Sequence, residues 1–174
     1  WFIVIKLSTR ITSEMTPIFR PGRYEDIPLL VKARLDFLRA LGYSVQPEDE
    51  SQIAQQIHGF LSEHLERDLF AYIAVEREII AAAGFLQVME VMWQPMASKG
   101  RYGRIINILT WPEFRRQGLA RTIMQELIQK AHELDLAYLD LDASPEGQPL
   151  YESLGFELTH AHHPPMRLVL SRNS

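Results

Sequence analysis

The segment from Gly118 to Leu134 constrains the fold of this chain more than any other, because its apolar residues recur at the spacing of one helix face. A strand-like run from Gly103 to Thr110 ends shortly before it. A helix with one apolar stripe must bury that stripe against a second layer. We therefore predict a helix that follows a strand, with Glu126 and Lys130 paired on its exposed side. The stripe consists of Leu119, Ala120, Ile123, Met124, Leu127, Ile128, Ala131 and Leu134.

Two further helices are expected upstream. Asp26 followed by Pro28 is typical of an N-cap and a first-turn proline, and Gly42 supplies a stop. The pattern of apolar residues predicts a second helix from about Glu48 to Arg67.

Short β-branched and apolar runs indicate strands in the remainder of the chain. The first two, separated by three charged residues, are expected to pair in antiparallel fashion. The resulting order of elements predicts an α/β fold with a mixed sheet and helices on both faces. The predicted strands are residues 70–75, 79–88, 103–110, 137–141, 156–158 and 166–170, with a short helix at 149–154.

Length and composition favour one domain. The chain has 174 residues, 47% of them hydrophobic, and no linker-like stretch or repeat interrupts it. It opens with Trp rather than Met, so we interpret Trp1–Glu14 as an added or misassigned extension and take residues 15–174 as the domain.

Charge and cysteine content exclude several classes of function. The net charge of -4 argues against nucleic acid as a partner. The chain has no cysteine, which excludes disulfides and a thiol nucleophile and fits a reducing cytoplasm. No apolar run approaches the roughly 20 residues of a membrane helix, so we expect a soluble protein with no membrane partner.

The joint between the predicted strand and the long helix has the features of an anion site. Arg115, Arg116 and Arg121 surround a helix start at which Gly118 and Ala120 leave the backbone accessible. The free N–H groups of a first helical turn and its positive dipole can hold a phosphate. On this local pattern alone, an ordinary solvated, basic helix start is an equal alternative. The sequence contains neither Gly-Lys-Ser/Thr after a glycine loop nor Gly-x-Gly-x-x-Gly, which weakens nucleotide-binding interpretations.

Two landmarks carry a resemblance to a known family. Arg115-x-x-Gly118-x-Ala120 resembles the Arg/Gln-x-x-Gly-x-Gly/Ala signature with which GNAT acyltransferases bind the pyrophosphate of coenzyme A. Further on, Leu150-Tyr151 and Gly155-Phe156 resemble the family's second landmark, with Ser144 in the place of the usual Asn. The chain is therefore similar to GNAT N-acetyltransferases.

The resemblance implies a mostly antiparallel central sheet, acetyl-CoA as the cofactor, and an amine on a small molecule, an amino acid or a peptide as the acceptor. It also implies that two copies can form a homodimer. A module that binds or senses acyl-CoA without turnover is the alternative function. The implied cofactor contacts are Ile108, Leu109, Thr110, Arg115, Arg116, Gln117, Gly118, Leu119, Ala120, Arg121, Thr122 and Ser144.

The same resemblance makes Tyr151 the candidate acid that protonates the departing thiolate. Its alternative is simple packing beside Phe156. Glu90, at the end of a predicted strand, is the first candidate for the general base, followed by Glu113 and Asp142, and ordered water could serve instead. Without a cysteine, direct attack in a ternary complex is favoured over a covalent acyl-enzyme.

Two residue clusters allow weaker interpretations. His160, His162 and His163 precede Pro164-Pro165 in a loop and lack the spacing that converges metal ligands, so we expect no metal. The acceptor pocket is expected to come from the first two helices and the segment from Glu90 to Tyr102, where Met92, Trp93 and Met96 could contribute.

Overall fold

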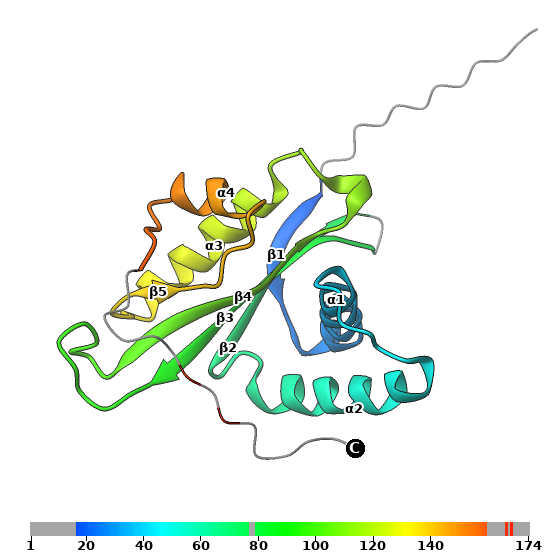
Figure 1. The fold of residues 1–174 in the computed structure, drawn as a ribbon, viewed down its shortest axis with the longest axis horizontal. Helices are drawn as coiled ribbons and strands as arrows, with labels where there is room; N and C mark the ends of the chain where they lie inside the picture. The colour runs from blue at the N-terminus through cyan, green and yellow to red at the C-terminus, as the bar shows by residue number, and fades with distance from the viewer. Residues whose placement is uncertain (1–16, 77–78, 160–165, 167, 169–174) are drawn as a thin grey trace, which may run out of the picture. The chain divides into compact units, whose positions relative to one another are not determined.

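The computed structural model describes residues 17–76, 79–159, 166 and 168 (Figure 1). The chain divides into two compact units, Trp1–Leu141 and Asp142–Ser174. The first unit contains one sheet, three long helices and two short 3-10 turns. Its helical elements are η1 (Tyr24–Asp26), α1 (Ile27–Ala40), α2 (Pro47–His64), η2 (Pro112–Phe114) and α3 (Leu119–Glu133).

The sheet has five strands in the order β1-β2-β3-β4-β5. The first four pair in antiparallel fashion, and β5 pairs parallel to β4. This arrangement confirms the mixed, mostly antiparallel sheet. The strands are β1 (Ile18–Gly22), β2 (Leu69–Glu76), β3 (Ile79–Glu90), β4 (Arg101–Thr110) and β5 (Leu139–Asp140).

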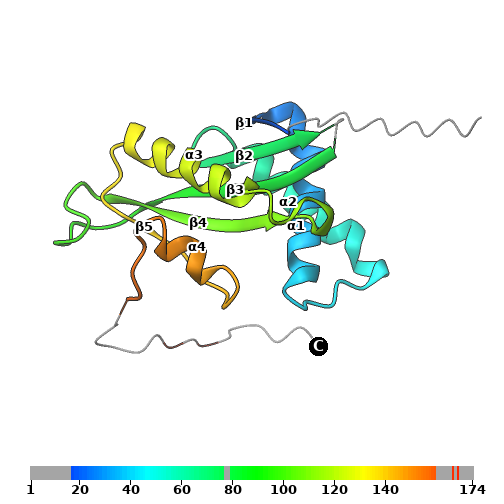
Figure 2. The ribbon, with the colours of Figure 1, turned by 90° about the horizontal axis from the view of Figure 1, so that it is seen from above.

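Alternation along the strands divides the core between the two faces of the sheet. Leu69, Ala71 and Ile73 of β2 pack with buried residues of α1 and α2, such as Leu30 and Leu61. The other face receives α3, so the sheet has helices on both faces, as expected (Figures 1 and 2). The buried residues of α3 are Leu119, Ile123, Met124, Leu127 and Ala131, all members of the predicted stripe.

A β-bulge interrupts the pairing of β3 with β4. Ala83 is opposite Leu109 and Phe85 is opposite Ile106, so two residues of β4 stand against the single residue Gly84. One of the two is Asn107, which has φ 59° and is 3% exposed. Asparagine is among the few residues other than glycine that adopt this left-handed conformation readily.

Gly84 permits a close approach between the sheet and α3 at the bulge. A Cβ on this residue would lie 2.5 Å from Ile108 Cδ1 and 2.8 Å from Ile123 Cγ2. Glycine is therefore required here by space rather than by backbone conformation.

Several local predictions were wrong in detail. Asp26 lies at the predicted N-cap position of α1, but its side chain makes no cap hydrogen bond: its carboxylate accepts hydrogen bonds from the guanidinium of Arg20, at 2.6 and 2.7 Å, and from Arg23 N, at 2.8 Å. These bonds hold the pKa of Asp26 below its usual value. The helix α2 ends at His64 rather than near residue 67, because Glu66 has φ 65°.

The exposed side of α3 also differs from the prediction. Lys130 Nζ donates to Glu133 Oε2 at 3.3 Å rather than pairing with Glu126. Its ammonium lies 4.9 Å from the ring centroid of Phe70, so a contact with the sheet draws the side chain away from Glu126.

The second unit contains the short helix α4 (Gln148–Glu152). A turn precedes it, in which Gly147 N donates to Ser144 O at 3.0 Å, and Gly155, with φ 92°, follows it. Residues 156–158 do not form the predicted strand. The predicted strand at residues 166–170 lies mostly outside the described residues, as do Trp1–Glu14.

Gly84→Ala tests the close packing of α3 on the sheet. We expect the free energy of unfolding to fall by about 1–3 kcal/mol, because the methyl group overlaps Ile108 and Ile123. Gly59→Ala is the matched control: Gly59 lies inside α2 with no atom within 4 Å of a built Cβ, so the same change should stabilise by about 0.5–1 kcal/mol. Urea denaturation measures both, and equal effects would contradict the packing.

Candidate functional site

The loop between β4 and α3 presents its backbone as an anion site. Arg116 and Gly118 have φ 64° and 80°, and Gly118 in its left-handed conformation is followed directly by Leu119 in the right-handed helix α3, an alternation that turns successive N–H groups toward one concave nest. The N–H groups of Leu119 and Ala120 follow in the first turn of α3, where no intrahelical acceptor exists. Apart from its chain neighbours, no atom of the described residues lies within 4 Å of a Cβ built on Gly118, so the space beside this glycine is open.

Trp111 fixes the start of this loop. Its indole Nε1 donates to Asp36 Oδ2 of α1 at 3.1 Å, and its backbone N donates to Ala81 O of β3 at 3.1 Å. Lys32 Nζ also donates to Asp36, at 2.6 Å. Burial raises the pKa of Asp36, but the hydrogen bonds from Lys32 and Trp111 outweigh it and hold the pKa below its usual value. The loop is therefore tied to both α1 and the sheet.

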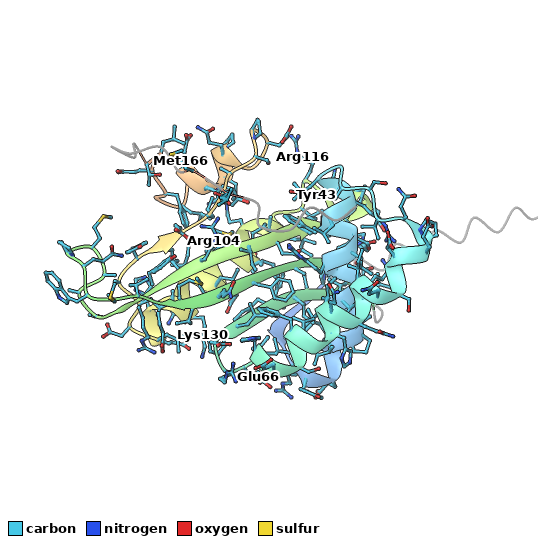
Figure 3. The ribbon with its side chains drawn as sticks, turned by 60° about the horizontal axis from the view of Figure 1, so that its bottom comes forward. Tyr43, Glu66, Arg104, Arg116, Lys130 and Met166 are labelled. Carbon is cyan, nitrogen blue, oxygen red and sulfur yellow. The ribbon has the colours of Figure 1, made fainter. Side chains whose placement is uncertain are left out.

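The edge of β4 next to the loop is open. The strand β5 pairs only with Gly103 and Arg104, where Arg104 Nη1 lies 3.4 Å from Asp140 Oδ1 (Figure 3 labels Arg104). From residue 105 to Thr110, β4 has no strand partner on this side within the described residues. The buried Thr110 Oγ1 has no hydrogen-bond partner in the described structure. This stretch of strand can pair with an extended ligand that carries amide groups.

The first unit thus brings most of the expected cofactor contacts together. Ile108, Leu109 and Thr110 end β4, and Arg115 to Thr122 continue through the loop into α3. Arg115 Nε donates to Thr110 O at 3.2 Å, which joins the two groups directly. The side chains of Arg116 and Gln117 are exposed, and Figure 3 labels Arg116.

Ser144 and Tyr151 belong to the second unit. Ser144 Oγ accepts a hydrogen bond from Gly147 N at 3.2 Å. Tyr151 lies in α4, with its ring edge-on to Phe156 at a centroid distance of 6.2 Å. Burial raises the pKa of Tyr151, and its hydroxyl has no hydrogen-bond partner within the described residues. The packing on Phe156 is therefore real, and the hydroxyl stays protonated over a wider pH range than usual.

The structure places Glu90, the first candidate for the general base, far from the loop. Glu90 is exposed and opposite Arg101, whereas Thr110, beside the loop, is opposite Ala82. Glu90 therefore lies at the other end of β4, roughly 30 Å along the strand from the loop. A strand end seen in sequence does not reveal which end of the sheet it occupies. Of the other candidates, Glu113 is exposed in η2 and Asp142 begins the second unit.

A pocket of about 450 Å³ opens on the α1–α2 face of the first unit. Three strands and both helices supply its walls, and the bulge directs Ile106 and Asn107 into it. Residues of the first two helices line this pocket, whereas the segment from Glu90 to Tyr102, all of which is described, contributes none. Its lining residues are Arg34, Gln56, Ile57, Phe60, Leu61, Leu69, Phe85, Gln87, Ile106 and Asn107.

A family model now links this geometry to known proteins. The model of the acetyltransferase (GNAT) family matches residues 30–156, which run from within α1 to just beyond α4 and include the loop before α3. The chain belongs to the GNAT family. GNAT proteins use acyl-CoA, and the fold and open helix start of this chain agree with that membership. No protein in the search of curated sequences matches the chain significantly.

Solved GNAT structures share the fold. A predicted acetyltransferase from Clostridium acetobutylicum, solved with acetyl-CoA, is 25% identical with a TM-score of 0.73, over 86% of this chain and 95% of its own. A GCN5-related N-acetyltransferase from Ralstonia eutropha is 23% identical with a TM-score of 0.73, over 86% and 97%. Glucosamine-6-phosphate N-acetyltransferase from Arabidopsis thaliana is 18% identical with a TM-score of 0.62, over 87% and 99%.

Two residues that line the pocket of this GNAT protein, Arg34 and Asn107, were not predicted from sequence patterns. In the sequence, neither residue belongs to a recognisable motif of its helix or strand. They come together only because of the bulge and because α1 packs against β4. Met92, Trp93 and Met96, which were expected to contribute, are 92%, 72% and 74% exposed. The histidines at 160, 162 and 163 lie outside the described residues. No helix within the described ranges has the length and hydrophobicity to cross a bilayer.

Trp111→Phe tests the anchor of the loop. At neutral pH we expect the free energy of unfolding to fall by about 1.5–3 kcal/mol, the usual contribution of a hydrogen bond to a charged group. Because the folded pKa of Asp36 is depressed, its contribution is complete above the unfolded value of about 3.9 and is lost as the pH falls through the folded pKa. The difference between variant and wild type should therefore shrink below about pH 4.

Trp93→Phe is the matched control, because Trp93 is 72% exposed. Urea denaturation between pH 2 and 7 measures all three proteins, and the control should stay within about 0.5 kcal/mol of wild type. A Trp111→Phe protein as stable as the control at every pH would contradict the anchor.

Proposed function

We propose that this GNAT protein is an N-acetyltransferase that transfers the acetyl group of acetyl-CoA to a primary amine of a small-molecule or peptide acceptor, by direct attack in a ternary complex. One observation carries the proposal: the N–H nest at the start of α3 lies next to an edge of β4 that, among the described residues, has no strand partner beyond Arg104 and ends in Thr110, whose Oγ1 has no hydrogen-bond partner there. A phosphate suits the first feature, and an amide-bearing chain suits the second.

The residues of the first unit fit coenzyme A. The nest from Arg116 to Ala120 would receive the pyrophosphate, with the charge of Arg115 nearby. The backbone of Ile108 to Thr110 would hydrogen-bond the amides of the pantetheine arm, and Thr110 Oγ1 would gain the partner that it lacks. Bound acetyl-CoA would supply an acetyl group activated as a thioester.

The acceptor amine is proposed to bind in the pocket between the two helices and the bulge. Asn107, in its wall, is about 10 Å along β4 from Thr110, so the pocket and the cofactor edge meet on one strand. Most of the wall is apolar, and an apolar wall favours the neutral amine that nucleophilic attack requires.

Proton transfer is proposed to involve Tyr151 and water. Tyr151 Oη would give its proton to the leaving sulfur and regain one from solvent, and its burial-raised pKa keeps that proton in place at neutral pH. None of the residues in the described lining of the pocket is a carboxylate or histidine. Ordered water, rather than Glu90, would therefore accept the proton of the attacking amine.

Gly118→Asp tests the cofactor site. We expect wild type to gain about 2.7 kcal/mol of stability at acetyl-CoA concentrations of about 100 times its dissociation constant. The variant should gain nothing, because its carboxylate would occupy and repel the phosphate position. Gly42→Asp is the matched control, since Gly42 also has φ 82° and open space, so it suffers the same backbone strain away from the nest. Thermal shift measures all three, and a ligand response in the folded Gly118→Asp protein would reject this site.

Tyr151→Phe tests the proton donor. Removing only the hydroxyl should lower kcat by roughly 10²–10⁴-fold while acetyl-CoA affinity stays close to wild type. Tyr24→Phe, at a tyrosine that is 60% exposed, controls for the loss of a phenol. The assay measures free thiol release with an accepted amine. An unaltered kcat where chemistry limits the rate would exclude this role, and acetyl-CoA binding without turnover of any amine would favour a sensing module.

A further inference from the structure

The pocket on the α1–α2 face contains a cation that has no carboxylate partner in the part of the chain that the structure describes. Arg34 of α1 lines it and is partly buried. No carboxylate within the described residues forms an ion pair with Arg34, whereas Lys32 and Arg39 on the same helix both pair with Asp36. Burial lowers the pKa of Arg34, yet a guanidinium stays charged at neutral pH. Burying a charge costs free energy unless the charge is paired, so a bound anion would stabilise this guanidinium.

Asn107 holds this guanidinium in place. Arg34 Nη1 donates to Asn107 Oδ1 at 3.3 Å, from helix to bulge. Asn107 is only 3% exposed, and its Nδ2 is buried without a hydrogen-bond partner in the described structure. Unsatisfied buried amides are rare in proteins, so the polar end of this pocket lacks an acceptor group.

The chemistry of the lining limits what that anion can be. Among the ten lining residues, all described, Arg34 is the only charged one, and Gln56, Gln87 and Asn107 are its only polar neighbours. One positive charge matches one negative charge, which suits a carboxylate better than a phosphate dianion. The other six residues are aliphatic or aromatic, such as Phe60 and Phe85, and suit an apolar body.

We propose that the acceptor is an amino carboxylate with an apolar body, whose carboxylate binds the Arg34 guanidinium. This inference rests on the proposed acetyl transfer and assigns the acceptor class for the same pocket. Asn107 acts as a positioning residue that orients Arg34. The geometry separates this class from amines that carry only hydroxyl groups or further positive charge, because those would leave Arg34 unpaired or repel it.

Matched acceptors test the class through selectivity. L-leucine and L-phenylalanine are compared with their carboxamides by the ratio of kcat/KM values for thiol release. Wild type should favour the carboxylates, and Arg34→Met should lower that ratio by about 10- to 100-fold. Comparing ratios between variants cancels the different basicity of the two amines. Arg39→Met, on the same helix but outside the lining, should keep the wild-type ratio.

Asn107→Asp provides a second variant with almost no change in shape. The new carboxylate would form an ion pair with Arg34 and so compete with the carboxylate of the ligand. Aspartate also tolerates the φ of 59° at this position. Selectivity for the carboxylate should fall about as far as in Arg34→Met, while the protein stays folded. Full selectivity in both folded variants would overturn the proposal.

A binding measurement separates this inference from the proposed reaction. The Arg34 Nε–Hε resonance, assigned by its loss in Arg34→Met, is followed by NMR during titration with L-leucine and with its carboxamide. A saturable shift with L-leucine alone, absent in Asn107→Asp, supports the carboxylate site even if no amine is acetylated. Equal responses to the two ligands, or none to either, would reject the carboxylate site, even if amines are acetylated.

Discussion

The β-bulge at Asn107 is the feature on which the rest of the site depends. By adding one residue to β4, it turns Ile106 and Asn107 toward the same face and lets Gly84 receive α3 closely on the other. The buried asparagine accepts a hydrogen bond from Arg34 of α1. One local irregularity therefore links α1, the pocket and the edge of β4. Bulges that redirect side chains in this way recur beside functional sites.

Patterns of local residues predicted the fold well. The apolar stripe of α3, the strands β2 to β4 and the helices on both faces follow from periodicity, because burial of one face determines which residues must be apolar. The loop from Arg115 to Gly118 was also identifiable, since a helix start and its flanking charges are local in sequence. The side-chain contacts of Asp26 and Lys130 could not be predicted, because Arg20 and Phe70, which they contact, come from other segments.

The pocket on the α1–α2 face could not be predicted from the sequence for the same reason. Nothing in the pattern around Asn107 distinguishes it from a loop asparagine, and the bulge arises only from the mismatch between β3 and β4. Glu90 shows a related limit of sequence patterns: it ends a strand, but at the end of the sheet away from the loop. Family membership places the chain among acyl-CoA-dependent acetyltransferases, and the acceptor class proposed here comes from the pocket.

We propose that the backbone of the β4–α3 joint holds the cofactor. Chemical-shift mapping of backbone amides during titration with coenzyme A can locate the bound phosphates, because N–H groups that bind phosphate shift strongly. We expect Gln117, Gly118, Leu119 and Ala120 to show the largest shifts and to saturate together, with smaller shifts at Leu109 and Thr110. Saturable binding whose largest shifts fall elsewhere, with these amides unmoved, would contradict it.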